Sequence, residues 1–210
     1  MQAPMFPLET ALLPGEELPL RIFEPRYSAL VRDCLATDDP VFGVVLIARG
    51  REVGGGDDRC DVGVLARIAQ FEDHGEGQYV LKCALAERIR VIEWLPDDPY
   101  PRAVVDVWPD EPGAVTADDI LGIEDRIFGL FERIATARDA HLPDREVLLG
   151  DPLEPDAGKR LYTLASRMPM GTADKYTVLA APSPAARLIA LREAVDTVAA
   201  MVEFQLNAGD

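Results

Sequence analysis

The sequence is poor in the residues that most often carry out catalysis or bind metals. Its 210 residues include two histidines, three cysteines and three serines, and no two of one kind lie close together. No Cys or His pair has the short spacing of a structural zinc site, and no serine has a nucleophile-elbow context. The cysteines are too few and too scattered for a disulfide framework. We therefore expect no catalytic residue, no metal and no cofactor.

A phosphate-binding loop is also lacking. A P-loop needs a glycine five residues before its Gly-Lys pair and a serine or threonine after it. Gly158-Lys159 has no glycine five residues before Gly158 and is followed by Arg160, so it is not a P-loop. The glycine triplet at 54–56 precedes two aspartates, which would repel phosphate. We expect only a flexible loop there, and neither ATPase nor peptidase activity.

Positive charge is scarce. The 21 basic residues face 37 acidic ones, the net charge is −16, and the lysines are Lys82, Lys159 and Lys175. Nucleic-acid affinity rests largely on neutralising phosphates, so such a surface repels nucleic acid at long range. We expect no nucleic-acid partner, and solubility explains the acidity.

Long apolar runs are absent as well. No uninterrupted run approaches the roughly 20 residues that span a bilayer, and the N-terminus lacks the basic region and apolar core of a signal peptide. We expect a cytoplasmic protein with no membrane partner. A hydrophobic fraction of 48% argues against disorder, and the length suits one domain with or without a subdomain.

What the chain does contain is a dense structural signature, LPLRIFEPRY, from Leu18 to Tyr27. Apolar residues alternate at its start, which predicts a strand with one apolar face. Pro19 lacks a donor, so this strand should lie at an open edge of a sheet, or Pro19 at the strand's start. Pro25 suits the first turn of a helix. The apolar residues that follow at helical spacing are Tyr27, Leu30, Val31, Cys34 and Leu35.

A longer stretch, FPLETALLPGEELPLRIFEPRY from Phe6 to Tyr27, resembles the opening of the Lon protease N-terminal domain family. Three further stretches agree in order, namely GVLARI at 63–68, ERIRV at 87–91 and MPMGTADKYTVLAAPSPAARLIAL at 168–191. The resemblance implies a PUA-like β domain followed by a helical subdomain, which in Lon proteases helps to recognise substrate polypeptides. It implies a free-standing homologue, because the family's ATPase module and Ser-Lys protease domain have no counterpart here.

The periodicity predicts an α+β protein with a boundary at Pro109 to Gly113. Residues 1–112 should form a mostly antiparallel β domain with one early helix, and residues 113–210 a helical subdomain ending in a long helix. The resemblance implies that the β domain is barrel-like. The expected strands are 6–13 and 18–22 around the Pro14-Gly15 turn, then 41–48, 62–71, 78–84, 89–94 and 102–108. The expected helices are 25–36, one capped by Thr116, 160–167, one capped by Thr172, and 184–207.

Candidate ligand contacts come from two parts of the chain. Around Pro25, the side chains of Arg21, Phe23, Glu24 and Arg26 could contact a peptide. Alternatively, Glu24 favours the helix N-terminus and Arg26 forms a surface pair, while Phe23 packs back on the first turn. At a later helix end, Met168 and Met170 could form an adaptable contact patch or fill the core.

Two functions from different classes fit these observations. The first is a non-enzymatic protein- or peptide-binding module, such as an adaptor or regulator in protein quality control, whose open strand edge beside Pro19 accepts an extended segment. The alternative is a nucleic-acid or nucleotide-binding PUA-like protein. The net charge and the lack of interleaved basic and aromatic residues weigh against it. An enzyme of another type is the least favoured, because nucleophiles and histidines are so few.

Overall fold

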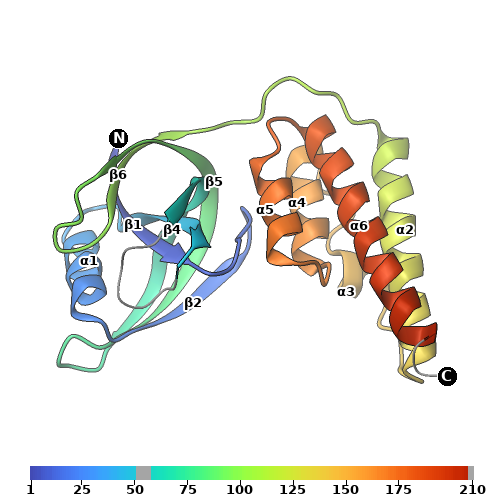
Figure 1. Cartoon of the computed structure of the whole chain (residues 1–210), viewed down its shortest axis with the longest axis horizontal. Coiled ribbons are helices and arrows are strands. Elements are labelled where there is room, and N and C mark those ends of the chain that lie inside the picture. The colour runs from blue at the N-terminus through green and yellow to red at the C-terminus, as the bar shows by residue number, and fades with distance from the viewer. Residues whose placement is uncertain (51–57, 208–210) are drawn as a thin grey trace. The chain divides into compact units, whose positions relative to one another are not determined.

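The computed structural model describes residues 1–50 and 58–207 (Figure 1). The predicted glycine loop at 54–56 lies outside these described residues. The chain divides into two compact units, residues 1–109 and 110–210. The sequence places this boundary after Pro112, a few residues later.

The first unit is a strongly bent sheet with one helix. Its strand order is β2-β5-β4-β3-β1-β6, and β5 also pairs with β6, so the sheet turns back on itself. All pairings are antiparallel except that of β1 with β3. The sheet is barrel-like rather than a closed barrel, which confirms the predicted architecture. The elements are β1 Gln2–Leu8, β2 Glu17–Ile22, α1 Pro25–Leu35, β3 Val41–Arg49, β4 Asp58–Asp73, β5 Tyr79–Leu95 and β6 Arg102–Val107.

The first strand lies earlier than the predicted 6–13, and it does not pair with β2, the strand that follows the Pro14-Gly15 turn. The first strand begins at Gln2 and pairs with β3 and β6, whereas β2 pairs with β5. A local turn signal indicates only that the chain bends, and it does not say which strands become neighbours. The two strands predicted over 78–84 and 89–94 are likewise one strand, β5. Arg88 and Ile89 are both buried, which interrupts the alternation without ending the strand.

The core of this unit lies inside the bent sheet. Gly63 on β4 has no room for a side chain, because an added Cβ would lie 2.1 Å from the carbonyl oxygen of Val44 on β3. Helix α1 buries the predicted stripe on one side, apart from Leu35, which is only half-buried. The central core residues are Ala3, Met5, Val45, Leu65, Ile89, Val91, Ala103 and Val105.

The second unit is helical. Its elements are α2 Ala117–Ala137, α3 Arg145–Leu149, α4 Ala157–Arg167, α5 Thr172–Ala180 and α6 Pro184–Asn207. Thr116 and Asp119 form the predicted capping pair at α2: the Asp119 N–H donates to the Thr116 hydroxyl at 3.1 Å, and the Thr116 N–H donates to the Asp119 carboxylate at 3.2 Å. At α6, the N–H of Ala186 donates to the hydroxyl of the predicted cap, Ser183, at 3.2 Å.

Two local predictions in this unit are wrong. Thr172 is the first residue of α5 rather than its cap, because the N-cap position is held by Gly171 and no side chain caps the helix. The short helix α3, at Arg145–Leu149, is absent from the helices expected from the sequence. A single helical turn shows too little periodicity to be recognised in a sequence.

Candidate peptide-binding site

A groove of about 100 Å³ opens between β1 and the end of β2. The two strands both contribute to its walls, although β1 pairs with β3 and β2 pairs with β5. Two strand edges without a ladder between them therefore border the groove. Its lining residues are Phe6, Leu8, Leu20, Arg21, Ile22, Phe23, Glu24 and Tyr27.

Among residues 1–50 and 58–207, β5 is the one strand that pairs with β2, so the outer edge of β2 is open to a further strand. The Leu85 N–H donates to the Glu16 carbonyl at 3.0 Å, one step before Glu17 and Ala84, the first partners in the β2–β5 register. Because hydrogen-bonded and non-hydrogen-bonded pairs alternate in an antiparallel ladder, Leu18, Leu20 and Ile22 bond to β5. The backbone groups of Glu17, Pro19 and Arg21 then point outward. This confirms the prediction that Pro19 lies at an open edge.

A second proline lies on the β1 side. The Met5 N–H donates to the Pro101 carbonyl at 2.8 Å rather than to β3. Because the backbone groups of successive residues in a strand point to opposite sides, those of Met5 and Pro7 both point away from β3. Pro7 removes one donor from that edge, as Pro19 does from the edge of β2. Prolines at both edges limit uncontrolled strand pairing. Both prolines keep their carbonyls, and Arg21 is the residue of β2 beside the groove whose outward edge offers an N–H donor as well as a C=O acceptor.

The prediction that Phe23 packs onto the first turn of α1 is wrong. The Phe23 side chain is 64% exposed. Side chains alternate along β2, and Ile22 is buried, so Phe23 points to solvent. The buried aromatic residue is instead Tyr27, whose ring stacks on Phe6 with centroids 4.1 Å apart. Phe23 thus forms an exposed apolar rim of the groove.

Glu24 and Arg26 are held against each other beside the groove. The Arg26 Nε lies 3.1 Å from the Glu24 carboxylate, and both side chains are more than four-fifths buried. The Arg26 guanidinium also lies 4.5 Å from the Tyr27 ring centroid. Glu24 occupies the N-cap position of α1 but makes no side-chain cap. The ion pair leaves Arg21 as the one exposed charged residue in the lining.

The two candidate methionines, Met168 and Met170, belong to the second unit. Met168 is buried as the residue that ends α4, so it fills the core and is not an exposed contact. Met170 is half-buried. Both belong to the helical unit, whereas Arg21, Phe23, Glu24 and Arg26 belong to the first. The sequence missed Leu8 as a wall of the groove, because no local pattern brings β1 beside β2.

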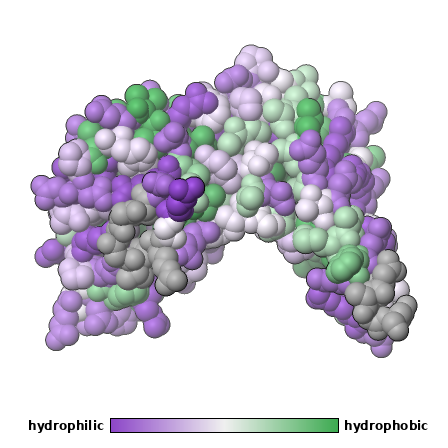
Figure 2. All heavy atoms as spheres, viewed as in Figure 1, coloured by the Kyte–Doolittle hydropathy of each residue, from purple (hydrophilic) through white to green (hydrophobic). Residues whose placement is uncertain are grey.

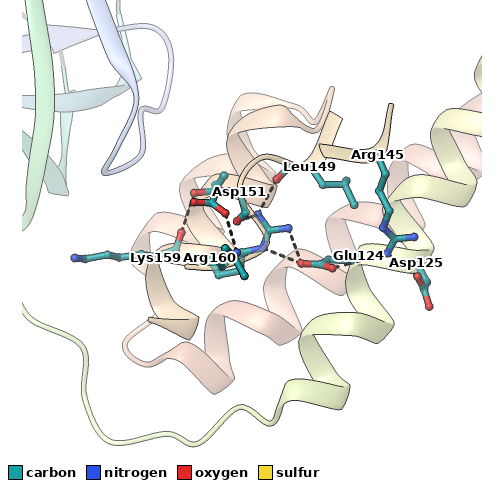
Figure 3. Close-up of polar contacts among 9 residues, drawn as sticks. Glu124, Asp125, Arg145, Leu149, Asp151, Lys159 and Arg160 are labelled. Atoms are coloured by element: carbon teal, nitrogen blue, oxygen red, sulfur yellow. Dashed lines mark hydrogen bonds and ion pairs between the residues drawn. The ribbon is translucent and has the colours of Figure 1, made fainter. Parts of the chain in front are cut away.

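A second cavity, of about 370 Å³, lies in the helical unit beside a buried ion pair. Figure 3 shows Arg160 of α4 pointing toward Glu124 of α2. Arg160 donates to the Glu124 carboxylate from Nε at 2.8 Å, and to the Leu149 and Asp151 carbonyls at 2.8 and 3.0 Å. These groups satisfy one another and join α2, α4 and the end of α3. We interpret them as structural, since a broken buried pair is costly.

Basic and aromatic residues, which the sequence does not interleave, are brought together by the sheet. The guanidinium carbons of Arg88 and Arg90 lie 4.0 and 3.6 Å from the ring centroid of Trp108. Arg88 is buried and donates to the carbonyls of Trp108 and Pro109 at 3.1 and 3.3 Å. These contacts tie the end of β6 to β5 and occupy the guanidinium of Arg88.

Residues 1–50 and 58–207 lack two further kinds of site. No group of His, Cys, Asp or Glu side chains in these ranges could hold a metal ion. None of the helices there combines the length and the apolar character needed to cross a membrane.

The fold and the groove together define a class of protein, in which a barrel-like β unit with an open strand edge precedes a helical unit. The chain belongs to the family described as the ATP-dependent protease La (LON) substrate-binding domain, whose family model matches residues 2–197. This confirms the resemblance found at Phe6 to Tyr27. The matched model is that of a substrate-binding domain and not of a protease or ATPase domain.

Curated relatives agree with the family. The chain is 34% identical over 123 residues to Lon protease 2 of Myxococcus xanthus, covering 57% of this chain and 15% of that protein. It is 32% identical over 109 residues to Lon protease of Anaeromyxobacter dehalogenans (strain 2CP-C), covering 51% and 13%. The matched region is therefore a small part of each relative's length.

Solved structures show the same fold. The Lon N-terminal domain protein from Xanthomonas campestris superposes with a TM-score of 0.67 and 27% identity, covering 92% of this chain and 98% of that one. The N-terminal domain of the Mycobacterium avium complex Lon protease gives a TM-score of 0.61 at 18% identity, covering 93% and 98%. The second likeness concerns the fold alone.

Proposed function

We propose that this chain is a non-enzymatic, cytoplasmic module that binds polypeptide segments or a partner protein in the groove between β1 and β2. The observation that carries the proposal is the open edge of β2 beside an apolar groove with the exposed Phe23 at its rim. The family description, a substrate-binding domain, supports polypeptide binding. An adaptor or regulator of proteolysis is the role that fits such a module.

The geometry suits an extended segment. The outward N–H and C=O of Arg21 provide a hydrogen-bonded pair for an added strand, and side-chain pockets provide the selectivity in this mode of recognition. A groove of about 100 Å³ is smaller than the roughly 300 Å³ minimum typical of small-molecule pockets. It has room for a single aliphatic side chain. Pro19 and Pro7 confine the hydrogen bonding to a short stretch.

Fluorescence anisotropy with labelled extended peptides tests the proposal. Phe23→Ser should weaken binding about tenfold, which is about 1.4 kcal/mol. Ile92→Ser is the matched control, because Ile92 is 58% exposed on the far half of β5; it should bind as the parent does. A peptide N-methylated at the amide that faces Arg21 should also bind less well. Equal loss with both variants, or full binding of the methylated peptide, would exclude recognition in this groove.

The non-enzymatic part of the proposal has its own test. Purified protein should turn over neither ATP nor a denatured protein substrate, because the chain lacks a phosphate cradle and an activated nucleophile. Reproducible turnover that a single substitution abolishes would contradict it.

A further inference from the structure

Arg21 is an exposed cation in the lining of the groove between β1 and β2. Within residues 1–50 and 58–207 its side chain makes no ion pair and no hydrogen bond. Arg26, by contrast, is held by the Glu24 carboxylate at 3.1 Å. An unpaired guanidinium presents five N–H donors to solvent. Arg21 is therefore available to bind an acceptor that arrives with a ligand.

The strand register places a second cation on the same face of the sheet. Arg21 lies opposite Val80, and Pro19 lies opposite Lys82. Opposite residues of an antiparallel ladder share a face, as do residues two apart in one strand, so Arg21 and Lys82 point the same way. Lys82 is exposed, and over the described ranges it makes no ion pair either. The two cations are diagonal neighbours, with Cα atoms roughly 7–8 Å apart.

This pair of unpaired cations lies in an acidic unit. Residues 1–109 contain 19 acidic and 11 basic residues, and hydrophilic atoms cover most of the first unit on the face that Figure 2 shows. Other arginines of the unit are held by carboxylates, as Arg59 is by Asp97 at 2.8 Å. The positive potential beside the groove is thus local, and Arg21 and Lys82 supply it.

The pleat of an added strand determines which of its side chains meets Arg21. The backbone groups of Arg21 point outward from β2, so in antiparallel addition one residue of the segment exchanges both hydrogen bonds with Arg21. The side chain of that residue lies on the outer face, beside the guanidinium. Its two neighbours in the segment oppose Leu20 and Ile22 on the inner face, which line the groove.

We propose that the groove selects segments in which an aliphatic residue has Asp or Glu directly beside it in the sequence. The inference rests on the proposed function and adds Arg21 to it as the specificity-determining residue. The aliphatic side chain enters the groove, while the neighbouring carboxylate binds the Arg21 guanidinium. Lys82 adds to the positive potential from the next strand, about 4.8 Å further from the segment.

The overall charge of the chain works against such a segment. The net charge of −16 repels a carboxylate, but the screening length at physiological salt is about 8 Å. Distant acidic residues therefore act weakly on the segment, whereas Arg21 acts in contact with it. We expect a preference of about threefold, which is about 0.7 kcal/mol and within the range of an exposed ion pair.

Fluorescence anisotropy with three labelled peptides at physiological salt tests the proposal. The peptides are identical except for Glu, Gln or Lys beside a central Leu. The parent should bind the Glu peptide about threefold more tightly than the Gln peptide, and the Lys peptide most weakly. In Arg21→Gln the order should reverse, because only the acidic net charge then distinguishes the peptides.

Arg32→Gln is the matched control. Arg32 is exposed in the same unit and lies outside the groove lining, so this variant loses the same charge and should keep the parent's order of peptides. Lys82→Gln should reduce the preference without abolishing it. Circular dichroism confirms that each variant is folded.

The outcomes separate this inference from the function on which it rests. Binding of all three peptides to the parent without a preference for Glu would overturn the inference and leave peptide binding in place. The same holds if Arg21→Gln keeps the parent's order, or if Lys82→Gln alone abolishes it. Absence of binding by all three peptides would contradict both proposals.

Discussion

At the scale of single residues, two neighbouring aromatic side chains have opposite roles. Tyr27 is 4% exposed and stacks on Phe6, while Phe23 is exposed at the groove rim. Strand periodicity governs Phe23 and helix periodicity governs Tyr27, although only four positions separate them. Stability and recognition can therefore be separated by substitution within one stretch.

Tyr27→Ala should destabilise the protein by about 3–5 kcal/mol, the range for emptying a large buried aromatic site. Phe23→Ala should change the free energy of unfolding by about 0.5 kcal/mol or less, as exposed substitutions do. Urea unfolding of both variants measures this. If Phe23→Ala proves the more destabilising, Phe23 is not the exposed rim residue described above.

Two buried thiols predict a loss of stability at alkaline pH. Burial raises the pKa of Cys34 to about 12, with Asp33 and Cys83 adding to the shift, and burial raises the pKa of Cys83 to about 12. The ordinary thiol value is 9.0. Above pH 9 the unfolded chain releases these protons while the folded chain keeps them, so stability falls as pH rises toward about 12.

Urea midpoints between about pH 8 and 10.5 should therefore decline, and the decline should be shallower in Cys83→Ala, which has one such thiol fewer. Burial and the hydrogen bond to Asp33 raise the pKa of Tyr100 to about 12. Tyr100 therefore also lowers stability as the pH rises, and it is still present in Cys83→Ala. An equal slope in the parent and in Cys83→Ala would mean that Cys83 is not protected in the folded state.

At the scale of elements, helix starts are decided by which residue holds the cap position. Thr116→Ala should cost about 0.5–2 kcal/mol, because it removes the hydroxyl that accepts from the Asp119 N–H. Thr172→Ala is the matched control. Thr172 lies inside the first turn of α5, where it makes no cap, so its loss should cost a few tenths of a kcal/mol at most. Thermal unfolding of both variants compares them, and similar losses would contradict the assignment of Gly171 as the cap.

At the scale of the whole molecule, the boundary between the units has a specific anchor. Arg187 is fully buried, and its Nη1 donates to the Asp110 carboxylate at 2.9 Å and to the Gly158 carbonyl at 3.1 Å. The guanidinium also lies 3.7 Å from the Tyr162 ring centroid. Asp110 therefore belongs physically to the helical unit, although the proline-rich boundary predicted from the sequence runs from Pro109 to Gly113.

A fragment of residues 110–210 should be more stable than one of residues 113–210. Without Asp110 the buried Arg187 loses its carboxylate, and breaking such a pair costs about 3–5 kcal/mol. Chemical unfolding of the two fragments measures the difference. Asp110→Asn in the full chain should give a smaller loss of the same sign. Equal stability of the two fragments would show that the Asp110–Arg187 pair contributes nothing.

The whole-molecule charge predicts weak or absent nucleic-acid binding. With a net charge of −16, labelled RNA and DNA should show no micromolar affinity at physiological salt. Anisotropy across a salt series measures this. Micromolar binding with a steep salt dependence, lost in Arg90→Ala, would instead favour the alternative function, with the Arg90–Trp108 stack as its contact.

The sequence by itself determined what is local. Alternation and helical spacing predicted the α+β class, the start of α1 at Pro25 and the long helix after Ser183, and the Thr116–Asp119 cap was recognisable from two residues. The Lon-type stretch from Phe6 to Tyr27 predicted the family. These features depend on interactions within a few residues, which the order of amino acids encodes directly.

Only the tertiary structure decided which distant segments meet. It placed β1 beside β3 and β6, brought Phe6 against Tyr27, and joined Asp110 to Arg187 across 77 positions. Pairing of strands and burial of side chains depend on the packing of the whole chain, so local periodicity does not specify them.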